Sequence, residues 1–348
     1  MMRYVGIDVG KAQCRAALVN QQGEVENEFF FENNTKGISE LTDVLTREDK
    51  VVMESTGNLW LNIYDTLDSK NIKVVLANPM QTTNRKKKKT DKIDARKLAR
   101  LLKADMISES YVPPIYLREM RALVRHRLSL VRMRTMEKNK VHAILDKYGF
   151  RCEYSDLFGK AGREWLGKLK LGELDCLLVG NHVGLIDSIG VQVKRVDEVI
   201  LGKASEEEDV RLLLSLTGVD VYTALLIKSE IGTIGRFDCY KKLVSWAGLA
   251  PSVYQSGEVD RRGGITKQGS VMLRWAIVEA AHIAVQRDER MKVFYLRVAA
   301  RRGSQKAVVA VACKMLKIVW FMLTRRETYR GVKGKRYGEK LKRIGVKV

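Results

Sequence analysis

The first 80 residues alternate between the sequence patterns of strands and helices, and this order restricts the possible fold more than any other feature. Strand patterns lie at residues 4–9, 14–20, 24–31, 51–53 and 73–77, and helix patterns lie at residues 35–45, capped by Thr35, and 59–67. Three strands followed by helix, strand, helix and strand are typical of a ribonuclease-H-like fold. We therefore predict an N-terminal α/β domain in which helices cover a mixed sheet.

Beyond the α/β domain the patterns are mostly helical. Between Tyr116 and Tyr148 apolar residues recur at steps of three and four, which predicts a long amphipathic helix that also carries many arginines. We interpret this helix as a coiled-coil arm between subunits, with an RNA-binding helix as the alternative. No chemistry can be recognised in residues 151–205. The expected domains are an α/β catalytic domain (1–105), a helical linker (106–205), a mostly α C-terminal domain (206–323) and a basic tail (324–348).

The charge of the chain favours a polyanionic partner. Lys and Arg total 63 against 41 Asp and Glu, which gives a formal net charge of +22. Each phosphate that a protein neutralises releases condensed counterions, so nucleic acid is favoured over the alternative, a membrane surface. The longest apolar stretch, 307–323, is interrupted by Lys314 and Lys317, which disfavours a membrane span. We expect a cytoplasmic protein with no membrane partner.

Two acidic residues stand at the ends of strand patterns. Asp8 ends the first strand in GIDVG, and Glu54 ends the fourth in MESTG, each before a turn that contains glycine. In open α/β sheets, sites are built at strand ends, so these carboxylates are candidates for one site. For Asp8 taken alone, an aspartate that only stabilises a turn and the phosphate loop of a sugar-kinase-like ATPase remain open.

A second acidic pair lies in the basic segment KTDKIDAR. Asp91 and Asp94 are three residues apart, so on a helix they share one face. One interpretation is a helix cap plus a salt bridge within the helix. The other is a Mg²⁺ site completed with Asp8 and Glu54, because Mg²⁺ prefers carboxylates and water and serves phosphodiester chemistry. The basic run before the pair either holds a DNA backbone or is a solvated surface, and it consists of Arg85, Lys86, Lys87, Lys88 and Lys89.

The sequence LTGVDVYTA in the C-terminal part resembles a helix–hairpin–helix. In that module the backbone amides of a glycine-containing turn hold DNA phosphates. Any two packed helices joined by a glycine turn produce a similar pattern, so the signal is moderately specific.

The next segment, PSVYQSGEVDRRGGITKQGSVMLR, is a polar stretch between two apolar helices, and we interpret it as a flexible loop. Its candidates for phosphate contacts are Arg261, Arg262 and Lys267. Chemistry alone leaves Ser252, Ser256 and Ser270 as equal candidates for a nucleophile, since a serine hydroxyl needs activation wherever it lies.

The order GIDVG, MESTG, KTDKIDARKLA resembles the DEDD transposases of insertion sequences, whose N-terminal domain is similar to the Holliday-junction resolvase RuvC. The sequence PSVYQSG…RRGGITKQG…LR is similar to the C-terminal domain found with them. The resemblance covers about residues 3–150 and 210–323, so the middle segment and the tail lie outside it.

The resemblance implies that Asp8, Glu54, Asp91 and Asp94 are the four metal ligands and that Ser256 is the nucleophile, which forms a covalent phosphoserine link with DNA. It also implies donor and target DNA, a bridge RNA that guides the reaction, and a dimer or tetramer in a prokaryotic cytoplasm, associated with the nucleoid. Two other functions stay open. One is a junction-resolving, metal-dependent nuclease in which water attacks, and the other is a nucleic-acid-binding protein without enzymatic activity.

Overall fold

The structure, a computed structural model, describes residues 2–55, 57–78, 91–256 and 259–346. Within 91–93, 253–256 and 259–262 the description is limited to the backbone. The chain divides into two compact units, residues 1–113 and 114–348, and each is described by itself.

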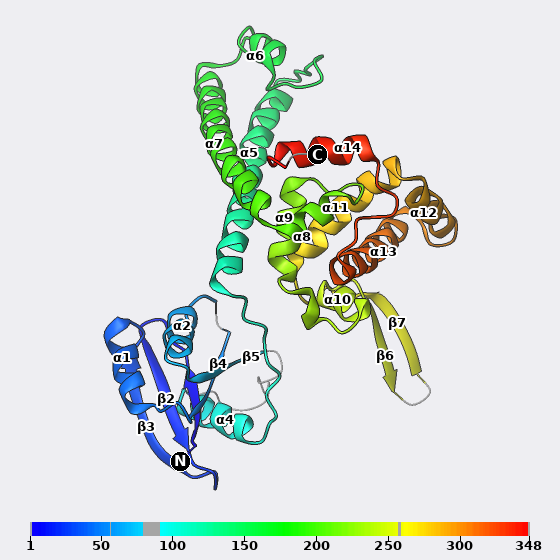
Figure 1. Cartoon of the computed structure of the whole chain (residues 1–348). Coiled ribbons are helices and arrows are strands. Elements are labelled where there is room, and N and C mark those ends of the chain that lie inside the picture. Colours follow the sequence, from blue (N-terminus) through cyan, green and yellow to red (C-terminus); the bar gives the residue numbers. More distant parts are fainter. Residues whose placement is uncertain (1, 56, 79–90, 257–258, 347–348) are drawn as a thin grey trace. The chain divides into compact units, whose positions relative to one another are not determined.

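The N-terminal unit is a five-stranded mixed sheet covered by helices (Figure 1). Its elements are β1 (Tyr4–Asp8), β2 (Gln13–Val19), β3 (Val25–Glu32), α1 (Thr35–Val44), β4 (Lys50–Glu54), α2 (Leu61–Ser69), β5 (Lys73–Ala77) and α4 (Asp91–Lys103). The strand order is β3-β2-β1-β4-β5, antiparallel from β3 to β1 and parallel from β1 to β5. The predicted α/β unit with a mixed sheet, which fits a ribonuclease-H-like domain, is confirmed.

Alternation along the central strands explains why helices cover both faces of this sheet. On β4, Val51 and Met53 pack with residues of α1 and α2 in one hydrophobic cluster, whereas Val52 packs with Leu98 of α4 in another. Because neighbouring strand residues point to opposite faces, a strand that is apolar at every position requires cover on both sides.

The cap of the first helix lies one residue earlier than predicted, so the helix begins at Thr35 itself. Asn34 is the N-cap, and its side chain accepts a hydrogen bond of 2.9 Å from the backbone amide of Gly37, while Thr35 is the first helical residue. An asparagine caps a helix at least as well as a threonine, so the choice of Thr35 was wrong.

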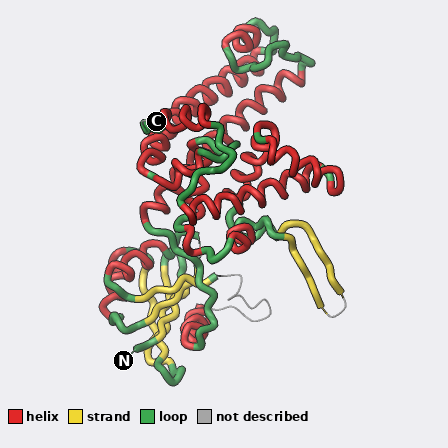
Figure 2. The backbone as a smooth tube through the Cα atoms, turned by 45° about the vertical axis from the view of Figure 1, so that its right-hand side comes forward, coloured by secondary structure: helices red, strands yellow, loops and turns green. Residues whose placement is uncertain are grey.

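The C-terminal unit is mostly helical and includes one two-stranded hairpin (Figure 2). Its elements are α5 (Ile115–Lys147), α6 (Lys160–Leu166), α7 (Glu173–Glu206), α8 (Glu208–Leu214), α9 (Val221–Ile231), the 3₁₀ turn η1 (Ile234–Arg236), α10 (Tyr240–Trp246), β6 (Pro251–Ser256), β7 (Val259–Ile265), α11 (Val271–Arg287), α12 (Glu289–Arg302), α13 (Ser304–Arg325) and α14 (Gly334–Arg343).

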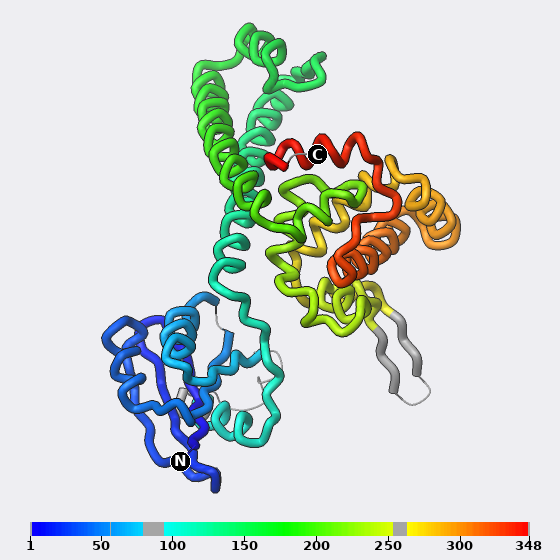
Figure 3. Tube along the Cα trace, viewed as in Figure 1, coloured from blue at the N-terminus to red at the C-terminus, as the bar shows by residue number. Residues whose placement is uncertain are grey.

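The long helix α5 packs within its own chain. Figure 3 shows α5 and α7 side by side, with α6 at the far end of the pair. Val141 of α5 packs with Val179 and Ile186 of α7 in one hydrophobic cluster, and Leu117 packs with the helices of the C-terminal region in another. The apolar seam of α5, expected to require a second subunit, is therefore covered in large part by α7 and by the C-terminal helices.

The basic tail also folds. α14 packs on α8, and its residue Leu341 and the C-cap residue Ile344 are buried in the main core of the unit. Together with Tyr337 they recur at steps of four and three, the spacing of one face of a helix.

Among the described residues, two helices, α7 and α13, are long and apolar enough to cross a membrane by length and composition alone. α13 meets that criterion although it contains Lys314 and Lys317, and half of its apolar segment is buried inside the protein. A core helix meets the same criterion, so these helices are weak grounds for a membrane span. α7 differs from α13 because most of its apolar window is exposed.

Candidate active site and nucleic-acid interface

Asp8 and Glu54 lie at the same edge of the sheet. β1 and β4 are parallel neighbours, and their register pairs Ile7 with Met53, so the next residue on each strand is one of the two acids. Both side chains are half-buried. The pairing of β1 with β4 therefore holds two carboxylates next to each other, as the sequence predicted. They lie at the edge of the sheet where the parallel strands have their carboxyl ends, which we call the carboxyl edge.

α4 runs antiparallel to β1 and places a third acid toward this edge. Its middle lies on Gly6, where a Cβ atom would be 2.0 Å from the carbonyl oxygen of Ala95, so the approach requires glycine. Its last residue, Lys103, lies near Gly23 in the turn between β2 and β3, at the end where β1 begins. The start of α4, with Asp94, must then lie toward the carboxyl edge.

Of the remaining candidate ligand, Asp91, the structure describes only the backbone. Asp91 is the first residue of α4, so it lies one turn before Asp94 on the side of the carboxyl edge. The basic run Arg85–Lys89 lies outside the described residues. Among the described residues, no three Asp, Glu, His or Cys side chains converge closely enough to form a metal site. The carboxylates on β1, β4 and α4 are nevertheless the oxygen donors that Mg²⁺ prefers.

An ion pair fixes α4 to the sheet. Arg96 donates to both carboxylate oxygens of Glu28 on β3, which also accepts from Arg15 on β2 at 3.1 Å. The hydrogen bonds from Arg96, followed by those from Arg15, hold the pKa of Glu28 below its usual range despite burial. The salt bridge of this basic segment thus joins α4 to the sheet and fixes the position of the helix along β1.

Ser256 lies at the tip of the β6–β7 hairpin, which extends from the helices in both views (Figures 1 and 2). It is the last residue of β6 and pairs with Val259, the first residue of β7. Arg261 pairs with Tyr254 and Arg262 with Val253, so both arginines lie on the strand beside the serine. The segment is thus a paired hairpin, and the prediction of a flexible loop was wrong.

The base of the hairpin is tied to the end of α10. Thr266 donates its backbone amide to Ala250 at 2.9 Å, and Lys267 donates to Gly248 at 3.0 Å. Gly269 has a φ of +91°, and a Cβ atom there would be 1.9 Å from the carbonyl oxygen of Trp246. These contacts hold the base in one position, and the side chain of Lys267 remains exposed there.

The two other candidate serines have structural partners. Ser252 donates its hydroxyl to the carbonyl oxygen of Gly264 at 3.0 Å, across the hairpin. Ser270 is the N-cap of α11: its oxygen accepts from the amide of Leu273, and its hydroxyl donates to the buried carboxylate of Glu230 at 3.0 Å. Both hydroxyls are thus engaged in holding the fold.

The sequence LTGVDVYTA forms a turn between α8 and α9. Gly218 in this turn has a φ of +92°, and Asp220 caps α9 by accepting from the amide of Thr223 at 2.8 Å. α14 covers one side, because Lys340 donates to the carbonyl oxygens of Leu214 and Val219. A small cavity of about 130 Å³ beside the turn is lined by Thr217, Gly218, Arg287, Lys333 and Arg336, among others.

Two arginines of α5 serve the interior of the unit. Arg121 donates to the carbonyl oxygens of Ser229 and Glu230, at the end of α9. Arg125 forms an ion pair of 2.6 Å with the Glu230 carboxylate. These two side chains are occupied by protein groups, which weakens the interpretation of α5 as an RNA-binding helix.

The chain is similar to transposases along most of its length. A family model described as a transposase of the DEDD type in IS110 elements matches residues 5–150, and one described as a transposase of the IS116/IS110/IS902 family matches residues 210–296. The transposase of insertion sequence IS1111A from Coxiella burnetii is 26% identical, over 94% of this chain and 92% of that protein. A putative transposase of Sinorhizobium fredii is 27% identical over 80% of this chain and 70% of its own length. The transposase of IS1328 from Yersinia enterocolitica is also 27% identical, over 59% of this chain and 63% of that protein.

Proposed function

The chain belongs to the DEDD-type insertion-sequence transposases of the IS110 family, and we propose that it cuts and rejoins DNA through a covalent bond to Ser256. As a transposase it is an enzyme that acts on DNA. The observation that carries the mechanism is a division of roles between two units. One unit holds paired carboxylates at a strand edge, and the other presents a serine at the tip of an anchored hairpin.

In this proposal, Asp8, Glu54, Asp91 and Asp94 hold Mg²⁺. Support comes from the register of β1 and β4, and from the direction of α4, which brings its first turn toward the same edge. A bound Mg²⁺ ion supplies Lewis-acid stabilisation of the charge that develops on phosphate oxygens. The register of β1 and β4 keeps the carboxylates of Asp8 and Glu54 side by side, and the ion pair between Arg96 and Glu28 holds α4 against the sheet.

Ser256 attacks the phosphorus atom of a DNA phosphodiester in the proposed reaction. The new bond joins the serine oxygen to phosphorus, and the bond from phosphorus to one deoxyribose oxygen breaks. The proton that the serine loses balances the proton that the leaving oxygen gains. The phosphoserine bond conserves the energy of the phosphodiester, so the reverse attack by a deoxyribose hydroxyl rejoins DNA without ATP.

Basic residues near both parts of the site bind the DNA backbone in this proposal. Arg261 and Arg262 lie on the strand that pairs with that of Ser256, and Lys267 lies at the base of the hairpin. Arg85–Lys89 precede the acidic helix in the sequence. The glycine turn between α8 and α9 is the proposed helix–hairpin–helix contact, since Arg287, Lys333 and Arg336 line the cavity beside it. Cations in these positions lower the free energy of a bound phosphate.

We further infer a bridge RNA that guides the choice of donor and target DNA, and a dimer or tetramer associated with the nucleoid. The net charge of +22 supports a nucleic-acid partner of either kind. For assembly, α5 and α7 leave apolar side chains exposed on the helical pair, among them Met136 at 54% and Leu177 at 61%. Light scattering that shows a monomer both with and without nucleic acid would contradict the oligomer.

The serine mechanism is tested by Ser256→Ala. We expect this variant to lose cleavage and to form no protein–DNA adduct that survives denaturation, while DNA binding remains, because one hydroxyl contributes little beside many phosphate contacts. Ser252→Ala and Ser270→Ala are matched controls, and both should retain the adduct.

Each outcome decides between mechanisms. Near-normal cutting by Ser256→Ala, with no adduct in the unmodified protein, would show a nuclease in which water attacks. Loss of the adduct in Ser252→Ala or Ser270→Ala alone would move the nucleophile to that residue. Cutting that persists in all three variants would exclude a serine mechanism.

A further inference from the structure

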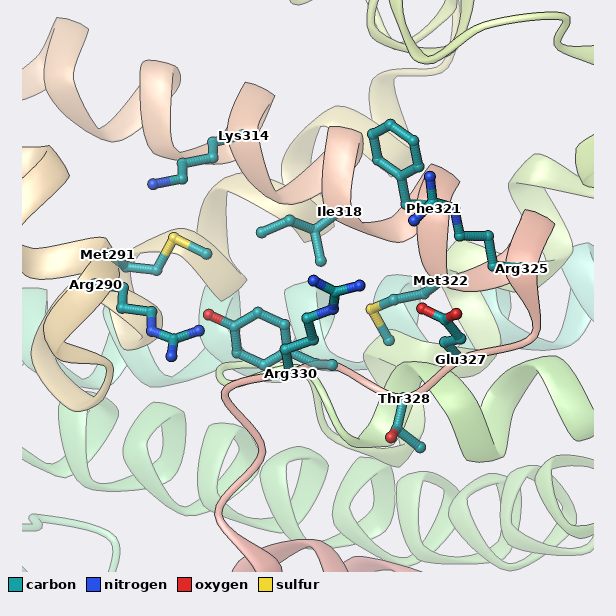
Figure 4. A pocket seen from close by; sticks show the side chains of 11 residues that line it. Arg290, Met291, Lys314, Ile318, Phe321, Met322, Arg325, Glu327, Thr328 and Arg330 are labelled. Carbon is teal, nitrogen blue, oxygen red and sulfur yellow. The ribbon is translucent and has the colours of Figure 1, made fainter.

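Two adjoining cavities lie along α13 in the C-terminal unit. They share the side chains of Lys314, Ile318 and Phe321, so they form one surface depression, which we call the α13 groove. One cavity has a volume of about 370 Å³, and Figure 4 shows Ile318 and Arg330 pointing toward each other across it. The other has a volume of about 780 Å³ and is bounded by residues of α10, α12 and α13.

Three aromatic rings from different helices line the groove. Tyr240 comes from α10, Phe294 from α12 and Phe321 from α13, and none of the three is fully buried. The rings of Tyr240 and Phe321 are 6.3 Å apart between centroids. Aromatic side chains that stay partly open on a groove surface are able to stack on planar ligands.

The groove is also strongly basic. Glu327 is its one acidic lining residue among the described residues. Its seven basic lining residues are Lys241, Arg290, Arg297, Lys314, Lys317, Arg325 and Arg330. This imbalance favours an anionic occupant over an apolar peptide or a second apolar surface.

The cations and the rings occur together. The Nζ atom of Lys314 is 4.5 Å from the ring centroid of Phe294, and that of Lys317 is 4.7 Å from the ring of Tyr240. These two lysines are the charges that interrupt the apolar stretch 307–323 of the sequence. Each ammonium group lies over the face of its ring. A base that stacks on the ring therefore takes the place of the lysine, whose flexible side chain can then turn its charge to the adjoining phosphate.

The groove adjoins the hairpin that carries Ser256. Ala250 and Pro251 line the larger cavity, and Pro251 is the first residue of β6. The strand from Pro251 to Ser256 spans about 17 Å at the usual rise of an extended chain. A DNA strand bound at the tip of the hairpin therefore has a short path along β6 into the groove.

We propose that the α13 groove binds an unpaired DNA strand next to the cleavage position, with bases stacked on Tyr240, Phe294 and Phe321 and phosphates held by the surrounding cations. Aromatic platforms in a basic groove are the means by which proteins bind single strands without sequence preference. The bases of a duplex are stacked on one another, so they are not available to stack on these rings. The choice of DNA over RNA rests on the proposed function, in which Ser256 acts on DNA.

The test uses the full chain, without divalent metal, and a fluorescent oligothymidylate as the probe in anisotropy titrations. Phe294→Leu keeps an apolar side chain of similar size and removes the stacking face. We expect it to lower affinity for the single strand about tenfold, and Tyr240→Leu to do the same. Phe30→Leu is the matched control, because Phe30 is also exposed and also lies under a cation, Arg15, but belongs to the N-terminal unit.

A second experiment measures how much the charges of Lys314 and Lys317 contribute to strand binding. Lys314→Ala combined with Lys317→Ala should reduce the slope of log affinity against log salt by about 1.4, since each phosphate contact on a single strand contributes about 0.7. Lys168→Ala combined with Lys170→Ala, an exposed pair outside the groove, should leave the slope nearly unchanged. This arm keeps the three rings, so it remains informative if a ring variant fails to fold.

Unchanged affinity in the ring variants together with an unchanged slope in the lysine variant would overturn the proposal. Tighter binding of oligouridylate than of oligothymidylate, lost in the same variants, would assign the groove to RNA and overturn the DNA assignment. The serine mechanism is judged separately, since Ser256→Ala should bind oligothymidylate normally. If the ring variants form the adduct with wild-type yield and also bind the strand as tightly as the unmodified protein, the proposed function stands and the groove is not the binding site of the strand.

Discussion

Asp8 and Glu54 lie level with each other at the carboxyl ends of the parallel neighbours β1 and β4. Their spacing is set by the strand ladder, so neither acid depends on a loop for its position. Asp8→Asn removes one charge at nearly constant volume and should abolish DNA cleavage while the fold persists. Asp43→Asn, an exposed acid on α1, should cleave at the wild-type rate. Robust cleavage by Asp8→Asn in Mg²⁺ would remove this residue from the catalytic site.

The contact between Gly6 and α4 leads to a second prediction. A Cβ atom at position 6 would be 2.0 Å from the Ala95 carbonyl oxygen and 2.6 Å from the Ala99 nitrogen, and both are backbone atoms that cannot rotate away. Gly6→Ala should therefore shift α4, destabilise the N-terminal unit by about 2 kcal/mol and reduce cleavage strongly. Hydrogen exchange of peptides from α4 measures the stability change.

Gly184→Ala is the control for that substitution. Gly184 lies in α7, and nothing lies within 4 Å of a Cβ atom built there. Alanine should stabilise the helix by about 1 kcal/mol. Wild-type cleavage and exchange in Gly6→Ala would show that α4 does not need its close approach to β1.

A site residue can be predicted from the sequence where the local pattern of apolar residues sets its position. It cannot be predicted where pairing between strands sets that position. The strand ends at Asp8 and Glu54 follow from apolar runs that stop at a glycine turn, so their meeting was predictable. The hairpin around Ser256 could not be predicted from local spacing. Its strands contain several polar and glycine residues, and only cross-strand pairing with β7 and the anchor at α10 make them strands. The proposal that Ser256 is the nucleophile rests on the family resemblance, since the hydroxyl chemistry of the three serines is the same.

Two helices were not predicted individually: α7, which lies within the predicted helical linker, and α14, which lies in the basic tail. α7 buries Val179, Ile186, Val193 and Ile200 at steps of seven, and four glycines within the helix weaken its local propensity. Packing against α5 supplies the stability that local sequence does not. The burial of α14 was readable from the spacing of Tyr337, Leu341 and Ile344, but the basic residues around them concealed it.

A pH-dependent prediction concerns Arg3 and Asp49 at the opposite edge of the sheet. Burial alone would raise the pKa of Asp49, but hydrogen bonds from the Arg3 guanidinium and from the Thr46 amide hold that pKa below its usual value. A carboxylate with a lowered pKa stabilises the folded state above its unfolded pKa, and this stability is lost as the pH falls through the folded pKa. The N-terminal unit should therefore lose stability below about pH 4.

Asp49→Asn tests that assignment. At pH 7 it should destabilise the N-terminal unit by about 2 kcal/mol, because it breaks a pair whose carboxylate is fully buried. The difference from the unmodified protein should shrink at pH 3, because part of the stability that the Asp49 charge supplies is lost once the pH falls below the pKa of the unfolded state. Hydrogen exchange of β4 peptides at the two pH values provides the measurement. An equal difference at both pH values would show that the charge of Asp49 contributes nothing.

The buried carboxylate of Glu230 gives the last prediction, because it joins α5, α9 and α11 at one point. Its oxygens accept from Arg125 at 2.6 Å and from Ser270 at 3.0 Å, and only 2% of the residue is exposed. Arg125→Ala leaves this charge half-satisfied, so we expect a loss of about 2 kcal/mol in the free energy of unfolding. The exposure of half the Arg125 side chain keeps the loss below that of a fully buried pair.

Removing both partners should cost less than the sum of the single losses. In the combined variant Arg125→Ala with Glu230→Ala no buried charge is left without a partner, so a double-mutant cycle should give a coupling of about 1 kcal/mol. Urea unfolding followed by tryptophan fluorescence measures each variant. Ser270→Ala should lose about 1 kcal/mol from its helix cap and still form the DNA adduct. Strictly additive losses would show that the ion pair between Arg125 and Glu230 contributes no coupling energy to the joining of α5 and α9.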